Sequence, residues 1–236
     1  MTYACTGRCK HCSEGESLSC SDKIDGKAAA EMIKAVCKHY EIKTLMTFGG
    51  EPLLAVDEVC LIHQTATEMG IPKRQIITNG YFSTDKNIIS ETAKRLSESG
   101  VNDVLLSVDA FHQETIPAET VKTFAEALLK ENVSVRLSPA WLVSKTDKNP
   151  YNEKTVEVLR IFKDMGIPES DGNIVFPEGN ARIYLKEYFD LTKPHVNPYA
   201  EDPRNVKTLS ISPNGDVLDG NIYKDSILDI ITNYGG

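Results

Sequence analysis

The sequence predicts an α/β protein built around a parallel β-sheet that curls, and two observations carry this prediction. Six short segments with the composition of β-strands alternate with longer segments whose apolar residues recur at helical spacing. Polar motifs stand directly after several of these strands, and consecutive βα units place such loops at one edge of the sheet. The length of 236 residues suits one α/β domain followed by a small appendage.

The strands are expected to be short. The first covers residues 2–4, fewer than the ~5–6 residues of an ordinary strand, so the chain is expected to begin inside its first strand. A fragment, a trimmed chain and a mis-assigned start are the alternatives. The fourth strand is an apolar run that suits a parallel strand covered on both faces. The five strands after the first are expected at residues 42–48, 75–80, 103–109, 133–139 and 173–176.

A helix is expected after each of the first five strands. The first of them places Ala29, Ile33 and Val36 on one face, which is the pattern of an amphipathic helix. Gly70 and Gly100 stand where two of these helices end, a usual stop signal. The five helices are expected at residues 26–40, 56–69, 86–99, 117–131 and 153–165.

Composition excludes several classes of protein. The net charge of −8 argues against a scaffold held to nucleic acid by phosphate contacts. No apolar run approaches the ~20 residues of a membrane span, and the first residues carry no signal-peptide pattern. These features fit a cytoplasmic protein, in which clustered cysteines indicate metal binding or catalysis more often than disulfides.

Three cysteines at the start of the chain form the most informative motif. Cys5, Cys9 and Cys12 have the spacing Cys-x3-Cys-x2-Cys, and a loop this tight can turn three soft thiolates toward one point. Three thiolates can hold three irons of a [4Fe–4S] cube and leave the fourth iron open to a substrate. Two alternatives stay open at this point: a redox dithiol formed by Cys9 and Cys12, and a Cys3His zinc site that includes His11. The zinc site is sterically poor, because His11 and Cys12 are adjacent and would have to converge.

A second motif follows the strand expected at 42–48. Gly49 and Gly50 permit positive φ and let the backbone approach a ligand closely. Glu51 supplies a carboxylate at the end of the strand, and Pro52 stiffens the exit. As an isolated pattern, Gly-Gly-Glu-Pro is more often a simple turn. Its place one βα unit after the cysteines makes it a specific signal.

Together the two motifs resemble the signature of the radical S-adenosylmethionine (radical SAM) superfamily, and the resemblance covers residues 1–182. It implies a partial (β/α)6 barrel, similar to a TIM barrel. It also implies one [4Fe–4S] cluster on Cys5, Cys9 and Cys12 and a bound S-adenosylmethionine. In that family the Gly-Gly-Glu-Pro motif binds the methionine amino group. The residue before the third cysteine is usually aromatic, and here it is His11, which is expected to contact the cofactor.

The resemblance extends to polar residues after later strands. Asn79 resembles the Asn of the family's Thr-Asn-Gly, and Ser107 and Asp109 resemble its Ser-x-Asp pair, which faces the methionine or ribose. Arg136 stands where the family often places a residue that meets the cofactor carboxylate, but a structural ion pair is an equal alternative. The turn at 177–182 resembles the family's Gly-Arg-Ala turn only in part, because Asn180 stands where Arg is common.

The remaining cysteines and histidines have ordinary explanations. Cys20 is expected in a solvated loop, Cys37 is expected as a small buried hydrophobe, and no role is assigned to Cys60. His63 is expected on a helix, either at the surface or satisfied in the core. His112 is expected in a solvated loop, with a role as substrate acid or base as the alternative. No catalytic residue is identified.

Residues 183–236 form the expected extension. A connector over 183–205 leads to a β-hairpin over 208–218 with the turn Asn214–Gly215, and then to a helix over 221–231. This pattern resembles the SPASM or twitch extension of radical enzymes that modify peptides. In those relatives cysteines bind auxiliary clusters there, but no cysteine follows Cys60 in this chain. The extension is therefore expected to lack cluster ligands.

The sequence thus predicts a radical SAM enzyme. The expected cluster cleaves S-adenosylmethionine reductively, and the resulting 5′-deoxyadenosyl radical abstracts hydrogen from a peptide or protein, with a small metabolite as the alternative substrate. A low cluster potential implies an electron donor of the ferredoxin or flavodoxin type. A degenerate, catalytically silent relative that acts as a binding partner is the alternative from another class. Neither nucleic acid nor membrane is expected as a partner.

Overall fold

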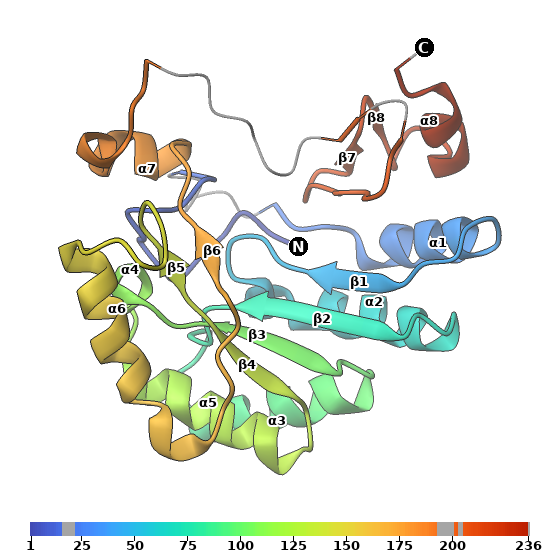
Figure 1. The fold of residues 1–236 in the computed structure, drawn as a ribbon. Coiled ribbons are helices and arrows are strands. Elements are labelled where there is room, and N and C mark those ends of the chain that lie inside the picture. Colours follow the sequence, from blue (N-terminus) through green and yellow to red (C-terminus); the bar gives the residue numbers. More distant parts are fainter. Residues whose placement is uncertain (16–21, 193–200, 203–204, 236) are drawn as a thin grey trace.

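The main sheet of the protein has four parallel strands (Figure 1). The computed structural model describes residues 1–15, 22–192, 201–202 and 205–235. The strand order is β1 (Thr44–Thr47), β2 (Lys73–Thr78), β3 (Asp103–Ser107) and β4 (Val135–Ser138). Each strand lies beside the one before it in the chain, as consecutive βα units require. The prediction of an α/β fold with a parallel sheet is confirmed.

A second, two-stranded parallel sheet pairs β5 (Ala140–Trp141) with β6 (Asn173–Ile174). Pro139 separates β4 from β5, since proline has no N–H to donate to a ladder. The strand expected at 133–139 thus ends at Ser138, and β5, beyond it, was not predicted. At the other end of the chain, Thr2 forms only an isolated antiparallel bridge with Lys23. The first predicted strand therefore belongs to neither sheet.

The five long helices begin within three residues of their predicted first residues and end within five residues of their predicted last residues. Asp25, Asp85 and Asn149 cap three of them by accepting hydrogen bonds from backbone N–H groups of the first turn. The helices are α1 (Gly26–Cys37), α2 (Val56–Glu68), α3 (Lys86–Glu98), α5 (Ala118–Lys130) and α6 (Pro150–Arg160).

Several short helical turns were not predicted. One of them, α4 (Ala110–Gln113), contains His112, so the expectation that His112 lies in a loop was wrong. Asp109 causes this turn, because its side chain caps the N–H groups of Phe111 and His112. The others are η1 (Pro52–Ala55), η2 (Lys163–Met165), α7 (Gly179–Tyr184) and η3 (Lys186–Tyr188).

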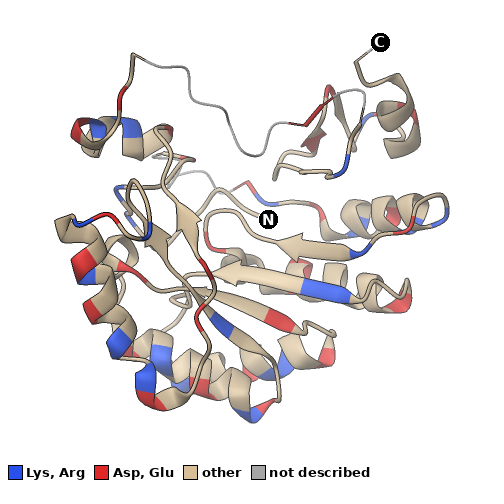
Figure 2. Ribbon diagram, in the orientation of Figure 1, with Lys and Arg blue, Asp and Glu red and all other residues tan. Residues whose placement is uncertain are grey.

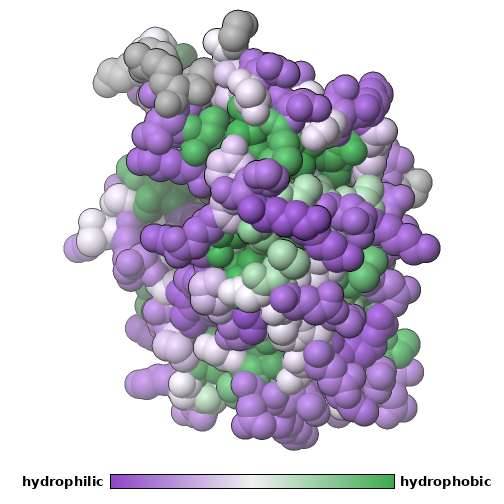
Figure 3. Space-filling model, turned by 90° about the vertical axis from the view of Figure 1, so that its right-hand side faces the viewer, coloured by the Kyte–Doolittle hydropathy of each residue, from purple (hydrophilic) through white to green (hydrophobic). Residues whose placement is uncertain are grey.

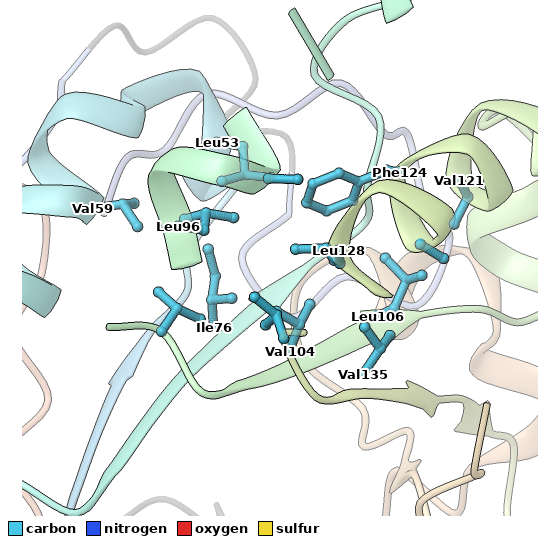
Figure 4. Close-up of a cluster of buried hydrophobic side chains, with 14 of the residues drawn as sticks. Leu53, Val59, Ile76, Leu96, Val104, Leu106, Val121, Phe124, Leu128 and Val135 are labelled. Carbon is cyan, nitrogen blue, oxygen red and sulfur yellow. The ribbon is translucent and has the colours of Figure 1, made fainter. Parts of the chain in front are cut away.

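The hydrophobic core lies between the main sheet and the helices α2, α3 and α5 (Figure 4). Alternate residues of the strands point to these helices, because side chains alternate across a strand. The labelled side chains of Figure 4 show the arrangement: Ile76, Val104, Leu106 and Val135 come from the strands, and Val59, Leu96, Val121, Phe124 and Leu128 come from the helices.

Two predictions about single residues on helices are settled by this core. His63 is fully buried on α2, and one ring nitrogen lies 2.9 Å from the hydroxyl of Thr47. Burial lowers its pKa to about 3, so the ring is neutral. Its Nε2 is satisfied by Thr47, whereas its buried Nδ1 has no hydrogen-bond partner among the described residues. Cys37 is half-buried and packs against the same core. Cys20 and part of the connector, 193–200 and 203–204, lie outside the described residues.

The C-terminal segment consists of β7 (Asp216–Val217), β8 (Gly220–Asn221) and α8 (Ile227–Asn233). The predicted hairpin register was wrong, because β7 pairs with β8 across Leu218 and Asp219. The Asn214–Gly215 pair does form a turn, closed by a 3.0 Å bond from the Gly215 N–H to Ser212 O. The Ile222 N–H bonds Gly215 O at 2.9 Å, so the residues of this turn pair with the segment that follows β8 and not with residues 208–212.

An apolar contact joins this segment to α1. Ile227 and Ile230 of α8 and Val217 of β7 are buried against Val36 of α1. Figure 3 looks at this side of the molecule and shows hydrophobic surface in its upper part, at the level of the C-terminal segment in Figure 1.

Acidic and basic residues are interspersed along the helices in Figure 2, and neither sign gathers on one helix alone. No helix in the described part of the chain is long and apolar enough to cross a membrane.

The core predicts a contrast between two leucines. Leu106→Ala removes a fully buried side chain and is expected to lower the free energy of unfolding by about 3 kcal/mol. Leu129→Ala, the same substitution at a position that is 42% exposed, is expected to cost less than about 1 kcal/mol. Urea denaturation of both variants measures the difference, and equal losses would contradict the assigned core.

Candidate metal centre

The three motif cysteines lie on one loop, beside α4 and α7 (Figure 1). Their thiols are free, with Cys9 buried and Cys5 and Cys12 half-buried. A side chain on Gly7 would lie 3.2 Å from Cys9 Sγ and 3.7 Å from Cys5 Sγ, so this glycine keeps open the space between two of the sulfurs. Burial raises the pKa of all three thiols, and a metal must therefore displace their protons.

Residues from distant parts of the chain hold this loop. The Asn180 N–H bonds Cys12 O at 2.9 Å, and the Asn180 side-chain amide bonds Cys9 O at 3.1 Å. The Arg8 N–H bonds the hydroxyl of Thr115 at 3.2 Å. Sequence reasoning assigned no role to Thr115 and noted Asn180 only as a departure from a family pattern. That departure was the available signal.

Gly49 and Gly50 admit the segment that leads into the cysteine loop. The Gly50 N–H donates to Thr2 O at 2.7 Å, and the Glu51 N–H donates to Ala4 O at 2.7 Å. A Cβ on Gly50 would stand 2.0 Å from Ala4 O, and Gly49 has a φ of +134°. The close approach predicted for a ligand is thus made here by the chain itself.

Glu51 is fully buried and faces inward. Its carboxylate accepts hydrogen bonds from the Leu53 N–H at 2.9 Å, the Thr78 hydroxyl at 2.7 Å and the Asn79 N–H at 2.9 Å. Burial nevertheless raises its pKa to about 7. Within the described residues, the carbonyl oxygens of Gly49 and Gly50 accept no hydrogen bond, which leaves them available to a ligand's donor.

Asn79 connects this network to the cysteine loop. Its side-chain amide donates to the Thr6 hydroxyl at 3.1 Å and lies 3.7 Å from Cys5 Sγ. Its side-chain oxygen accepts from the Tyr81 N–H at 2.8 Å. The structure therefore places the Asn79 side chain beside the cysteine loop, and its predicted contact with the cofactor stays a prediction.

Asp109 is fully buried, and its carboxylate carries four hydrogen bonds. One oxygen accepts from the N–H groups of Phe111 and His112, and the other accepts from the Ala140 N–H at 3.0 Å and from His112 Nδ1 at 2.8 Å. Burial alone would raise its pKa, but His112 outweighs burial and lowers it to about 2. The structure thus directs Asp109 to the protein's own donors. The hydroxyl of Ser107 makes no hydrogen bond within the described part of the chain.

Arg136 pairs with Asp103. Its guanidinium lies over both carboxylate oxygens, with Nε 3.0 Å from Oδ1, and Gln75 donates to the same carboxylate at 2.6 Å. Asp103 is the first residue of β3, so the pair lies toward the amino end of the sheet. Of the two alternatives for Arg136, the structure favours the ion pair, whose partner is a strand residue.

His11 lies between two rings. Its ring centroid is 4.8 Å from that of Phe111 and 4.9 Å from that of His112. Its Nδ1 is buried and has no hydrogen-bond partner. Burial lowers the pKa of His11 to about 4, so the ring is neutral.

Comparison with known proteins agrees with the motifs. Residues 1–192 match the family described as the Radical SAM superfamily. The chain belongs to this superfamily.

It is similar to a probable GTP 3′,8-cyclase of Saccharolobus islandicus (strain L.S.2.15 / Lassen #1), at 24% identity over 85% of this chain and 63% of that protein. It is also similar to the GTP 3′,8-cyclase of Listeria monocytogenes, at 26% identity over 80% of this chain and 56% of that protein. The chain therefore spans roughly three fifths of these relatives' length.

A crystal structure of methylornithine synthase aligns with 72% of this radical SAM chain and 53% of its own, with a TM-score of 0.45 and 14% identity. The family match ends at residue 192. The resemblance of the C-terminal segment to a SPASM or twitch extension thus receives no support from these comparisons.

The radical SAM superfamily implies a [4Fe–4S] cluster and S-adenosylmethionine, and the residues present fit a cluster. Three free thiols share one loop, Gly7 leaves space between two of their sulfurs, and bonds from Thr115 and Asn180 hold the loop in place.

Gly50→Ala is expected to destabilise the radical SAM domain by about 3 kcal/mol or to prevent folding, because the new methyl group would meet Ala4 O. The control is Gly70→Ala, which has a φ of +72° but no atom within 4 Å of the new Cβ, whereas Gly50 does not lie at positive φ. That variant is expected to lose about 1 kcal/mol. Thermal and urea unfolding compare the two, and a similar loss for both would argue against the tight contact.

The raised pKa of Glu51 predicts that the stability of the folded protein depends on pH. Its pKa is raised in the folded chain, so its contribution is complete below the unfolded value near 4.5 and is lost as pH rises through about 7. The total change is about 3 kcal/mol. Between pH 4.5 and 7 the unfolding free energy of Glu51→Gln is therefore expected to fall less than that of the wild type. Glu126→Gln, which removes an exposed carboxylate, serves as the control. Parallel pH profiles for all three proteins would contradict the raised pKa.

Proposed function

We propose that Cys5, Cys9 and Cys12 hold one [4Fe–4S] cluster and that the chain is an active radical SAM enzyme. When bound, such a cluster reduces S-adenosylmethionine, and the 5′-deoxyadenosyl radical removes a hydrogen atom from a substrate. The observation that carries the proposal is the placement of three free thiols on one anchored loop, next to the Gly-Gly-Glu-Pro segment.

The chain's own residues would orient and shield the bound groups. The free carbonyl oxygens of Gly49 and Gly50 suit the methionine amino group, and the Ser107 hydroxyl suits another polar group of the cofactor. Glu51 and Pro52 would act by shaping this segment, because the Glu51 carboxylate is occupied and Pro52 is buried at the start of η1.

In this proposal the other residues predicted as cofactor contacts act indirectly, by positioning the residues around the cluster. Asn79 would position the loop through Thr6, and His11 would form part of the wall beside the cluster. Asp109 would orient His112, and Arg136 would keep the sheet in place through Asp103.

We further infer that the two parallel sheets form one partial barrel. The pairing of β6 with β5 continues backwards toward β4, since the Ser170 N–H, before β6, bonds Leu137 O of β4 at 2.8 Å and the Asn173 N–H of β6 bonds Pro139 O, between β4 and β5, at 2.9 Å. We place the end of this domain at residue 182 and regard 183–236 as a separate extension without cluster ligands, similar to a SPASM or twitch segment.

Two substrate classes are proposed. A peptide or protein follows from the likeness to SPASM-type enzymes. A small nucleotide is favoured by a different observation, since two relatives are named as GTP 3′,8-cyclases. In either case a ferredoxin or flavodoxin would supply the electron, and we propose the cytoplasm as the compartment, where thiols stay reduced. Neither nucleic acid nor a membrane is proposed as a binding partner.

Anaerobic reconstitution with iron and sulfide tests the proposed function. We expect ~4 iron atoms per chain and an electron paramagnetic resonance signal of the reduced protein that changes when S-adenosylmethionine is added. Cys9→Ser is expected to abolish this signal, and Cys37→Ser, a substitution outside the motif, is expected to keep it. Formation of 5′-deoxyadenosine under dithionite separates an active enzyme from a catalytically silent relative.

A protein that binds no cluster, or whose signal ignores S-adenosylmethionine, would refute the proposal. The substrate classes are then compared by adding GTP to the reconstituted enzyme. Faster formation of 5′-deoxyadenosine with GTP would favour the nucleotide, and an unchanged rate would remove the support that the relatives' names give to it.

A further inference from the structure

A second set of metal-ligating atoms lies at the cysteine loop. One ligand atom each from Cys9, His11 and His112 lies within 4.8 Å of the other two. Only Cys9 belongs to the proposed cluster ligands, and the two histidines come from different elements, the loop and α4. This set is therefore distinct from the cysteine triad, although it shares one member with it.

His112 is held as metal-binding histidines usually are. Its Nδ1 lies 2.8 Å from a carboxylate oxygen of Asp109, and its side chain is 16% exposed. Metal ligands of this type almost always give one ring nitrogen to a carboxylate or carbonyl, which fixes the ring and leaves the other nitrogen for the metal. The Asp109–His112 pair provides this support for a ligand at Nε2.

His11 supplies an independent observation. Its Nδ1 is buried without a partner, and such an unsatisfied buried polar atom costs free energy. A metal ion would satisfy this nitrogen.

Two imidazoles and one thiolate suit zinc. Tetrahedral zinc binds sulfur at about 2.3 Å and nitrogen at about 2.0 Å, which places its ligand atoms ~3.5 Å apart. The observed separations of up to 4.8 Å require a closure of about 1 Å, within the reach of side-chain rotation. Three protein ligands leave a fourth position for water.

We propose that the chain without its cluster binds one Zn²⁺ through Cys9, His11 and His112, and that this ion competes with cluster assembly because Cys9 is shared. The site differs from the Cys3His arrangement considered from the sequence. It replaces Cys5 and Cys12 with His112, a residue about one hundred positions away along the chain. The competition, but not the zinc site itself, rests on the proposed cluster function.

Cobalt titration of the cluster-free protein under anaerobic conditions tests the zinc site. Co²⁺ reports a thiolate ligand by a charge-transfer band and tetrahedral geometry by its visible bands, and Zn²⁺ should abolish both. We expect saturation at one equivalent. Cys9→Ser should remove the charge-transfer band, whereas Cys5→Ala should leave it unchanged.

The histidine variants decide between this site and adventitious binding to the cysteines. His112→Ala and His11→Ala are each expected to weaken Co²⁺ binding at least tenfold. His112→Asn, which keeps a polar side chain, guards against a loss of folding, and circular dichroism confirms the fold of each variant. Binding that depends equally on Cys5, Cys9 and Cys12 and ignores His112 would refute the zinc site.

Competition is measured by adding iron and sulfide after one equivalent of Zn²⁺. Cluster formation should be slowed in the wild type and unaffected in His112→Ala, which retains all three cysteines. Equal rates in the two proteins would overturn the competition. A wild type that never forms a cluster, with or without zinc, would refute the proposed function and leave the cobalt result standing.

Discussion

The contact between the Gly-Gly-Glu segment and residues 2–4 is the constraint on which the site depends. Two backbone hydrogen bonds of 2.7 Å join Gly50 to Thr2 and Glu51 to Ala4. The cysteine loop begins one residue later, at Cys5, so its position over the sheet follows from this contact. Only glycine at position 50 permits it, because a Cβ there would stand 2.0 Å from a carbonyl oxygen. The two motifs of the sequence are therefore two halves of one structural unit.

Glu51 extends this unit across the sheet. Its buried carboxylate accepts hydrogen bonds from Thr78 and Asn79 at the end of β2, and Asn79 in turn donates to Thr6 of the cysteine loop. Burial of a carboxylate is costly unless its oxygens are hydrogen-bonded, and here three donors meet them. The arrangement couples β1, β2 and the loop, so displacement of one of them strains the other two.

Local patterns were sufficient to predict the four strands of the main sheet and the five long helices, because each rests on residues close together in sequence. Partners that come from distant segments were not predictable in this way. Asn180 holds Cys9 and Cys12 from more than 160 residues away, and its departure from the family pattern did not by itself indicate this contact. The hairpin register failed for a related reason, since Asn214–Gly215 has the preferred turn residues but bonds forward to residue 222.

The charged residues that the sequence suggests as cofactor contacts have partners within the scaffold. Glu51, Asp109 and Arg136 all have protein partners that occupy their charged groups. Physical chemistry explains this outcome, because a buried charge must be paired within the folded chain before any ligand arrives. Among the described residues, the groups left for a cofactor include two carbonyl oxygens, the Ser107 hydroxyl and the unpartnered nitrogen of His11, all of them uncharged. A charged cofactor at this site would therefore be met mainly by neutral dipoles, together with whatever charge a metal at the cysteines supplies.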